Sequence, residues 1–249
     1  MKGMEYFYEL YSGIPRGGPG DNGSTRKAFS VMKGLPLQPN ILDIGCGPGM
    51  QTLELARISN GNIIALDNYQ PFLDKLMENA RREGLEDRIK PINRSMLEMD
   101  FRDETFDVVW SEGALYFMGF AKGLERCRQL LKDNGYLAVT EAVLFRPDPP
   151  RPVIEFWEKE YPAITDVESN IEMIRRAKFR LISHFPLPVS SWLDNFYDPM
   201  EALIHELMGK YEGNKVAMEI FGNSLSEVST YKKYSDYFGY EFFIMQKTE

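Results

Sequence analysis

Cysteine and histidine are scarce in this chain of 249 residues, which has two of each. Two thiols, Cys46 and Cys127, are too few and too far apart for a disulfide framework or a four-ligand zinc site. No apolar run approaches the roughly 18 residues that a membrane span requires, and the N-terminus lacks the apolar core of a signal peptide. We therefore expect a cytoplasmic protein without a metal site or membrane contact.

Basic residues are fewer than acidic residues. The chain has 29 basic and 37 acidic residues, and a formal net charge of -8. A molecule with this charge repels phosphate backbones as a whole, so no nucleic-acid partner is expected. Hydrophobic residues at 43% and aromatic residues at 13% are close to globular averages, which argues against disordered, collagen-like and coiled-coil chains.

From residue 40 to about 145, short apolar runs rich in β-branched residues alternate with amphipathic stretches. This alternation is typical of βαβ units around a parallel sheet. Helices are expected to begin near Met50, near Pro71 and at Phe120, and Asp133-Asn134-Gly135 predicts a turn before the fifth strand. The predicted strands are 40–44, 62–67, 88–93, 106–111, 136–143, 178–188 and 240–248.

The composition changes after Phe145. Residues 146–152 carry four prolines and predict a stiff connector, since proline fits neither a central strand nor a helix interior. Helices are expected over 153–160 and 166–178. A largely helical segment of the chain then runs from Trp192 to Tyr240, with Asp198-Pro199 as a helix start.

The most informative stretch is ILDIGCGPGM, residues 41–50, in which three glycines follow a strand and precede a helix. Glycine allows a sharp turn and the close approach of a ligand, and the amides at a helix start face whatever binds there. A dinucleotide site has the spacing G-x-G-x-x-G, but Met50 stands where the third glycine belongs, and no triphosphate-binding G-x-x-x-x-G-K-[ST] occurs. The acidic Asp43 before the glycines suits a ligand with a cationic group.

Four motifs in order, DIGCGPG, the acidic end of NIIALD, FDVVWSEGALY and LLKDNGYLAVTEAV, resemble those of class I S-adenosylmethionine-dependent methyltransferases of the small-molecule, type 11 or 25 kind. The resemblance covers roughly residues 25–145 and continues more weakly through the last two predicted strands. It implies an α/β, Rossmann-like, doubly wound sheet of seven strands in the order 3-2-1-4-5-7-6, with strand seven antiparallel and with helical cap insertions.

The resemblance also implies where the cofactor binds. In the family, the glycine loop wraps the methionine part of S-adenosylmethionine, Asp43 helps to anchor its amino end, and the acid ending strand two, Asp67, holds the ribose hydroxyls. Ser95 and Met96 stand where the family often has an Asp that accepts from the adenine amino group; a hydroxyl can replace that acceptor, and Met96 can pack on the base. The implied cofactor-binding residues are Asp43, Gly45, Cys46, Gly47, Gly49, Asp67, Asn68, Ser95, Met96 and Ser111.

Residues after strand four should face the transferable methyl group. Glu112 and Tyr116 are the candidate catalytic residues, with the alternative that Glu112 only caps the following segment and Tyr116 only packs. Glu141 at the end of strand five is a similar candidate or a solvated carboxylate. Methyl transfer mainly requires alignment of the reacting atoms, so a general base is optional. His205 is a weaker candidate base, His184 belongs to strand six, and Cys46 is interpreted as a packing residue.

We expect one domain over residues 1–249. Residues 1–30 form a lid or a helix on the sheet edge, and 31–145 form the cofactor-binding core. Residues 146–191 and 240–249 complete the sheet, and the insertion 192–239 is a helical substrate cap or ordinary core.

The predicted function is methyl transfer from S-adenosylmethionine to a small-molecule acceptor, leaving S-adenosylhomocysteine, by a monomer or homodimer. A nicotinamide-dependent oxidoreductase is a less favoured alternative because of Met50. A cofactor-binding regulator that performs no chemistry is another. The motifs leave oxygen, nitrogen, carbon and sulfur acceptors open.

Overall fold

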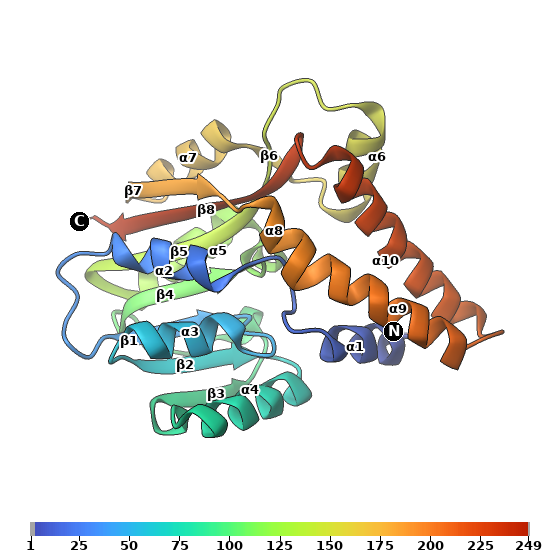
Figure 1. Ribbon diagram of the computed structural model, residues 1–249. Coiled ribbons are helices and arrows are strands. Elements are labelled where there is room, and N and C mark those ends of the chain that lie inside the picture. The colour runs from blue at the N-terminus through green and yellow to red at the C-terminus, as the bar shows by residue number, and fades with distance from the viewer. Residues whose placement is uncertain (1–2, 249) are drawn as a thin grey trace.

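Seven strands form the continuous path of one mixed sheet. In the computed structural model, which describes residues 3–248, the order is β3-β2-β1-β4-β5-β8-β7 (Figure 1). Residues 1, 2 and 249, assigned above to the lid and to the end of the sheet, lie outside the described residues. The strands are β1 (Asn40–Ile44), β2 (Asn62–Asp67), β3 (Ile89–Asn93), β4 (Phe106–Glu112), β5 (Leu131–Leu144), β7 (Phe179–Pro186) and β8 (Phe238–Lys247).

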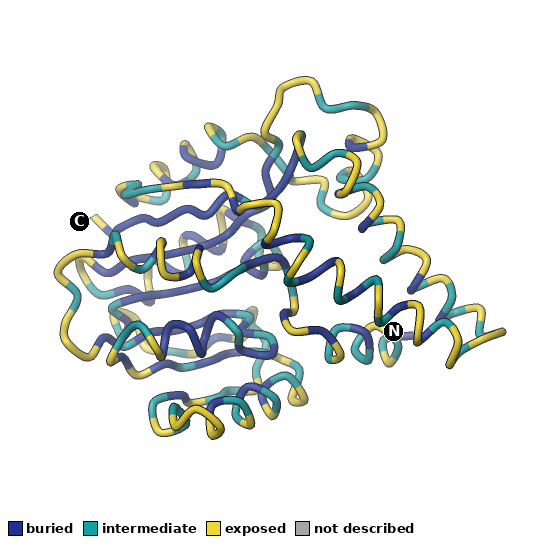
Figure 2. Tube along the Cα trace, viewed as in Figure 1, coloured by how far each residue is buried: buried dark blue, intermediate teal, exposed yellow. Residues whose placement is uncertain are grey.

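This order confirms the predicted arrangement, because β7 and β8 are the sixth and seventh predicted strands. Strands β1 to β5 run parallel, whereas β8 is antiparallel to both of its neighbours, β5 and β7. Strands β1, β4, β5 and β8 are buried over most of their length, as expected for a sheet covered on both faces (Figure 2). A short additional strand, β6 (Thr165–Asp166), pairs with the end of β5; two residues are too few to show a periodic pattern.

Helices cover both faces of the sheet and pack buried residues against the strands. One face carries α2 (Asn22–Ser30), α3 (Met50–Ile58) and α4 (Gln70–Glu83). The opposite face carries α5 (Phe120–Leu130) and α7 (Val167–Arg176). Within residues 3–248, no helix is both long and apolar enough to cross a membrane.

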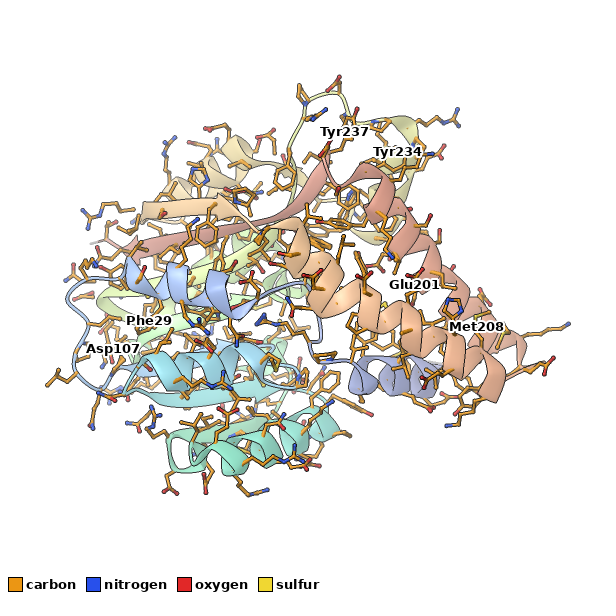
Figure 3. The ribbon with its side chains drawn as sticks, viewed as in Figure 1. Phe29, Asp107, Glu201, Met208, Tyr234 and Tyr237 are labelled. Carbon is orange, nitrogen blue, oxygen red and sulfur yellow. The ribbon has the colours of Figure 1, made fainter. Side chains whose placement is uncertain are left out.

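A third layer lies beyond the carboxyl ends of the parallel strands (Figure 1). Its helices are far apart in the chain but share one apolar core: α1 (Met4–Gly13), α6 (Arg151–Glu160), α9 (Asp198–Lys210) and α10 (Lys215–Tyr234). Glu201 projects from α9 and Tyr234 lies near the end of α10 (Figure 3). The Lys232 ammonium on α10 donates to Glu201 Oε2 at 2.8 Å, which ties the two helices together at their surface.

The N-terminal segment, predicted as a lid or a single helix, contains two helices. Asp21 caps the second, α2, because its carboxylate accepts a hydrogen bond from the Ser24 amide at 2.8 Å. Two residues before the cap, Ile14 and Arg16, are buried, with exposures of 1% and 4%. Although α2 belongs to the predicted lid, it packs on α3 and the sheet, whereas α1 joins the third layer.

Two prolines lie at helix starts. Asp198-Pro199 starts α9, as predicted, and α8 (Val189–Trp192) and a π-helical turn (Leu193–Tyr197) lead directly into that helix. Pro199 has no N–H to donate to the preceding turn, and a widened turn accommodates its ring. At the other site, α6 begins at Arg151, inside the predicted connector, with Pro152 in the first turn, where a missing N–H costs nothing.

The predicted turn 133–135 is a bulge inside β5, not a boundary of it. Phe106 pairs with Leu131 and Val108 pairs with Tyr136, so the intervening residues of β5 loop out of the register. Asn134 adopts φ of 60°, which asparagine tolerates better than most residues.

Candidate active site

The glycine loop between β1 and α3 has the conformation that its glycines predict. Gly45, Gly47 and Gly49 adopt φ of 71°, 53° and 90°. A Cβ at Gly45 would lie 2.4 Å from Cβ of Ala114, and one at Gly49 would lie 2.2 Å from Cδ1 of Leu76. A Cβ at Gly47 would meet nothing closer than 3.9 Å. Two of the glycines therefore allow close packing, and Gly47 leaves main-chain surface open to a ligand.

Asp67, at the end of β2, reaches into the same loop. Its Oδ2 accepts a hydrogen bond from the Gly47 amide and its Oδ1 from the Tyr69 amide, both at 2.9 Å. These amides orient the carboxylate, but burial outweighs them and raises the pKa of Asp67. The next residue, Asn68, is exposed.

Asp43 faces the first turn of α3 and is fully buried. Its Oδ2 accepts a hydrogen bond from the Thr52 hydroxyl at 2.6 Å, and its Oδ1 has no hydrogen-bond partner among residues 3–248. Burial, together with the negative charges of Glu112 and Asp67, raises the pKa of Asp43 to about 7. The free oxygen can accept a hydrogen bond from a ligand.

A buried ion pair joins the N-terminal segment to the end of β4. Arg16 Nη2 lies 3.3 Å from Glu112 Oε2, and the two side chains are 5% and 4% exposed. Glu112 Oε1 also accepts hydrogen bonds from the Thr25 hydroxyl and the Trp110 indole, each at 2.9 Å. The other terminal nitrogen of Arg16, Nη1, has no partner in the described part of the chain. Protein donors thus occupy both oxygens of Glu112, while Arg16 keeps a free donor.

The segment after β4 and the end of β5 bring a second group together. Tyr116, on the 3-10 turn Leu115–Met118, has its ring centroid 5.5 Å from that of Tyr161. Burial, with Glu227 and Glu141 nearby, raises the pKa of Tyr116. Glu141 is 2% exposed, and burial raises its pKa to about 7, partly offset by the Tyr161 hydroxyl. The candidates Tyr116 and Glu141 therefore share one environment, apart from the ion-paired Glu112.

The remaining implied cofactor residues lie around the loop. Met96 Cε is 3.5 Å from the place of a Cβ on Gly45, so its thioether borders the glycine loop. Ser95 caps the short turn that follows β3, because its hydroxyl accepts a hydrogen bond from the Leu97 amide at 3.2 Å. The Ser111 hydroxyl is buried and donates to a main-chain carbonyl of β1 at 3.0 Å.

The environments of Cys46 and of the two histidines are those of structural residues. Cys46 is buried, and burial with the charges of Asp43 and Asp67 raises the pKa of its thiol. His184 Nδ1 lies 2.6 Å from Glu241 Oε1, on the edge strand β7 and its neighbour. His205 is exposed on α9. Over residues 3–248, no group of three or more potential ligands could hold a metal ion.

Sequence reasoning misses three residues of this region: Arg16, Tyr161 and Glu227. Arg16 pairs with Glu112 across 96 positions of the sequence and stands in a glycine- and proline-rich stretch that is usually exposed. Tyr161 and Glu227 come from segments without a motif. Only the unusual aromatic content of the helices beyond residue 145 could have pointed to such a group.

Comparison with protein families agrees with the motif resemblance. Residues 41–135 match the family model described as a methyltransferase domain. A sterol 24-C-methyltransferase from Eremothecium gossypii is 31% identical over 105 residues, which are 42% of this chain and 28% of that enzyme. The chain thus matches less than a third of the length of this curated relative.

Solved structures share the whole fold. A methyltransferase from Geobacter sulfurreducens, determined with S-adenosyl-L-homocysteine, has a TM-score of 0.84 at 17% identity, covering 97% of both chains. The [4+2]-cyclase SpnF has a TM-score of 0.73 at 21% identity, covering 98% of this chain and 92% of its own. The methyltransferase fold is therefore established, and the resemblance read from the motifs is confirmed over residues 41–135.

Proposed function

We propose that this chain, which carries a methyltransferase domain over residues 41–135, is an enzyme that transfers a methyl group from S-adenosylmethionine to a small molecule and releases S-adenosylhomocysteine. The observation that carries the proposal is the convergence of Asp67, the open main chain at Gly47 and the free oxygen of Asp43 on one loop.

The residues of the loop fit the cofactor chemically. The methionine part of S-adenosylmethionine ends in an ammonium and a carboxylate, and its sulfur is a sulfonium cation. Asp43 Oδ1 is a buried acceptor without a partner, and Arg16 Nη1 is a buried donor without a partner. Asp43 and Arg16 belong to the same group of charged side chains, because Arg16 pairs with Glu112 and the charge of Glu112 raises the pKa of Asp43. A ligand that carries both an ammonium and a carboxylate gives a hydrogen-bond partner to Asp43 Oδ1 and to Arg16 Nη1.

We assign each residue a part in holding the cofactor. Asp43 accepts from the ammonium, Arg16 donates to the carboxylate, and Asp67 accepts from the ribose hydroxyls. Asp67 already holds the Gly47 amide, so ribose binding and the shape of the loop are coupled. When bound, the cofactor supplies an electrophilic methyl group, and the protein supplies position and exclusion of water.

Glu112 serves best as a positioning residue. Its two oxygens receive hydrogen bonds from Arg16, Thr25 and Trp110, so it fixes the guanidinium toward the loop. Tyr116 is free of such bonds and stands with Glu141 on the side where an acceptor would bind, which makes these two the better candidates for contact with the acceptor.

A second candidate is an enzyme of this fold that catalyses a reaction other than methyl transfer, since one chain of the same fold is named a [4+2]-cyclase. The cofactor-binding regulator that performs no chemistry has no comparison in its favour. The nicotinamide alternative has no comparable support, because Gly49 is the N-cap of α3 and the helix starts at Met50 without a further glycine. We keep a cytoplasmic location as part of the proposal, supported by two free, buried cysteines.

Calorimetry tests the cofactor assignment. We expect micromolar binding of S-adenosylmethionine and S-adenosylhomocysteine to the full chain, and at least about a tenfold loss in Asp67→Ala, because a charge-assisted hydrogen bond contributes about 1.5–3 kcal/mol. Asp67→Asn, which keeps an acceptor for one of the two amides, separates ribose binding from loop folding. The matched control is Asp74→Ala on the exposed side of α4. Absence of binding by the wild type contradicts the proposal.

A further inference from the structure

A group of tyrosines and carboxylates gathers where the third layer meets the end of the sheet. Its members come from separate segments, and we call them the tyrosine–carboxylate cluster: Tyr11, Tyr116, Glu141, Tyr161, Glu227 and Tyr240. Tyr11 lies on α1, Tyr116 on the turn after β4, and Glu141 on β5. Tyr161 lies in the coil after α6, Glu227 on α10 and Tyr240 on β8. Elements this far apart in the chain converge because the third layer packs over the carboxyl ends of the strands (Figure 1).

Contacts and charges show that the cluster is one group. The rings of Tyr116 and Tyr161 have centroids 5.5 Å apart, and a Cβ at Gly113 would lie 3.2 Å from the Tyr240 ring. The negative charges of Glu227 and Glu141 raise the pKa of both Tyr116 and Tyr240, in addition to burial. Each carboxylate is therefore within electrostatic range of both rings.

Glu141 is the buried, unpartnered member. Its residue is 2% exposed, and its Oε2 has no hydrogen-bond partner among the described residues. Glu141 faces the cluster, because the Tyr161 hydroxyl lies close enough to lower the pKa of Glu141. This effect partly offsets the rise in that pKa that burial causes. A carboxylate in this state is costly unless a ligand supplies a positive or donating group.

Glu227 adds a second carboxyl group, from α10. Its Oε1 accepts a hydrogen bond from the Tyr197 hydroxyl at 2.9 Å. Within residues 3–248, neither Glu141 nor Glu227 forms an ion pair with a basic side chain. The charge of Lys159 lowers the pKa of Glu227, but its ammonium forms its ion pair with Glu160, at 2.9 Å. Burial raises the pKa of both carboxyl groups, and a bound cation would favour their ionised forms next to the aromatic faces.

Aromatic faces and carboxylates both attract cations. The ring quadrupole favours a positive charge over its face, and the effect grows when water is excluded. Tyr11, Tyr116, Glu227 and Tyr240 keep part of their surface accessible, although burial strongly affects their pKa values. These four side chains are therefore only partly covered by the protein.

We propose that the tyrosine–carboxylate cluster binds the methyl acceptor and that the acceptor is an amine, which enters as its ammonium cation. This inference rests on the proposed methyltransferase function and narrows its substrate class. The rings of Tyr116 and Tyr161 surround the nitrogen, and the carboxylates of Glu141 and Glu227 neutralise its charge.

Such an acceptor must lose one proton before it can act as a nucleophile. An N–H bond of the ammonium breaks, the proton moves to a Glu141 oxygen, and the electron pair stays on the nitrogen, so an ammonium and a carboxylate become an amine and a carboxylic acid. The proton acceptor is the free Oε2, which no protein donor occupies. A neutral acceptor would bring no positive charge to balance either carboxylate.

Binding of choline tests the inference, with its uncharged isostere 3,3-dimethylbutan-1-ol as the comparison. The two molecules have the same shape, and only choline is positively charged. On the full chain saturated with S-adenosylhomocysteine, we expect choline to bind at least about tenfold more tightly, which corresponds to about 1.4 kcal/mol. Equal binding of the two, or binding of neither, overturns the inference.

Variants locate the site. Glu227→Gln should weaken choline binding about tenfold or more, whereas Glu219→Gln on the exposed side of the same helix should leave it unchanged. Glu141→Gln is the second test, and bound S-adenosylhomocysteine reports that each variant is folded. An equal loss in the Glu219 control, or no loss in either cluster variant, rejects the cluster as the site. If choline binds but neither cofactor form binds, the proposed function fails while the cation site stands.

Discussion

Replacing Asp43 with asparagine should make the ligand-free protein more stable at alkaline pH. The folded-state pKa of Asp43 is about 7, whereas an unfolded aspartate titrates near its ordinary value of 3.8. A group with a raised folded pKa contributes its full stability below the unfolded pKa and loses it as the pH rises through the folded pKa. The ionised Asp43 side chain therefore opposes folding above pH 7.

The magnitude follows from the two pKa values. Each pH unit between them is worth about 1.4 kcal/mol, so the raised pKa of Asp43 lowers the free energy of unfolding by about 1–2 kcal/mol at about pH 5 and by about 4 kcal/mol at about pH 8. Asparagine avoids this cost and keeps an acceptor for the Thr52 hydroxyl, but its amide nitrogen occupies the place of an unpartnered oxygen. An unsatisfied donor costs about 1–3 kcal/mol at every pH.

Urea unfolding of protein freed of cofactor measures the difference. The free energy of unfolding of Asp43→Asn minus that of the wild type should rise by about 2–3 kcal/mol between about pH 5 and pH 8, because the amide does not titrate. Asp74→Asn, on the exposed side of α4, should show no such trend. A difference that stays constant across this range, or falls, refutes the reasoning that burial raises the pKa of Asp43.

Three further predictions follow from the packing. Gly49→Ala should cost about 2–4 kcal/mol in chemical unfolding, from left-handed strain and a clash with Leu76, whereas Gly222→Ala on α10, with open space around it, should be neutral or stabilising. Arg16→Met should cost about 3–5 kcal/mol because Glu112 stays buried without its ion partner, and adding Glu112→Gln should recover part of that loss in the same assay. The two cysteine thiols, whose pKa values burial raises, should resist a thiol reagent at about pH 8 in the native protein and react on denaturation; rapid native labelling contradicts their burial.

Local patterns predict the sheet and the glycine loop because those features depend on neighbouring residues. The positive φ values of the glycines and the alternation of strands and helices can both be predicted from short stretches of the sequence. The contact of Arg16 with Glu112 depends on tertiary packing, and no local window contains it. The same holds for Tyr161 and Glu227, which reach the site only through the packing of the third layer.

The proline signal is correct, whereas the turn signal is correct in kind and wrong in place. Pro199 lies in the first turn of α9, as predicted, although the preceding π turn keeps the chain helical before it. The turn at 133–135 exists, yet the flanking residues Leu131 and Tyr136 both pair with β4, which keeps it inside the strand. Tertiary pairing decides where an element ends, and a local signal does not contain that pairing.

The position of β8 has a consequence for biosynthesis. It follows every other strand in the chain, yet it lies between β5 and β7 and forms hydrogen bonds with both. While the ribosome is still making the preceding helices, β5 and β7 carry unpaired edges that can join other chains. Completion of the sheet therefore waits for late synthesis and for a pairing of long sequence separation, which is slow to form. Removal of β8 should leave a chain that aggregates, not a smaller folded protein.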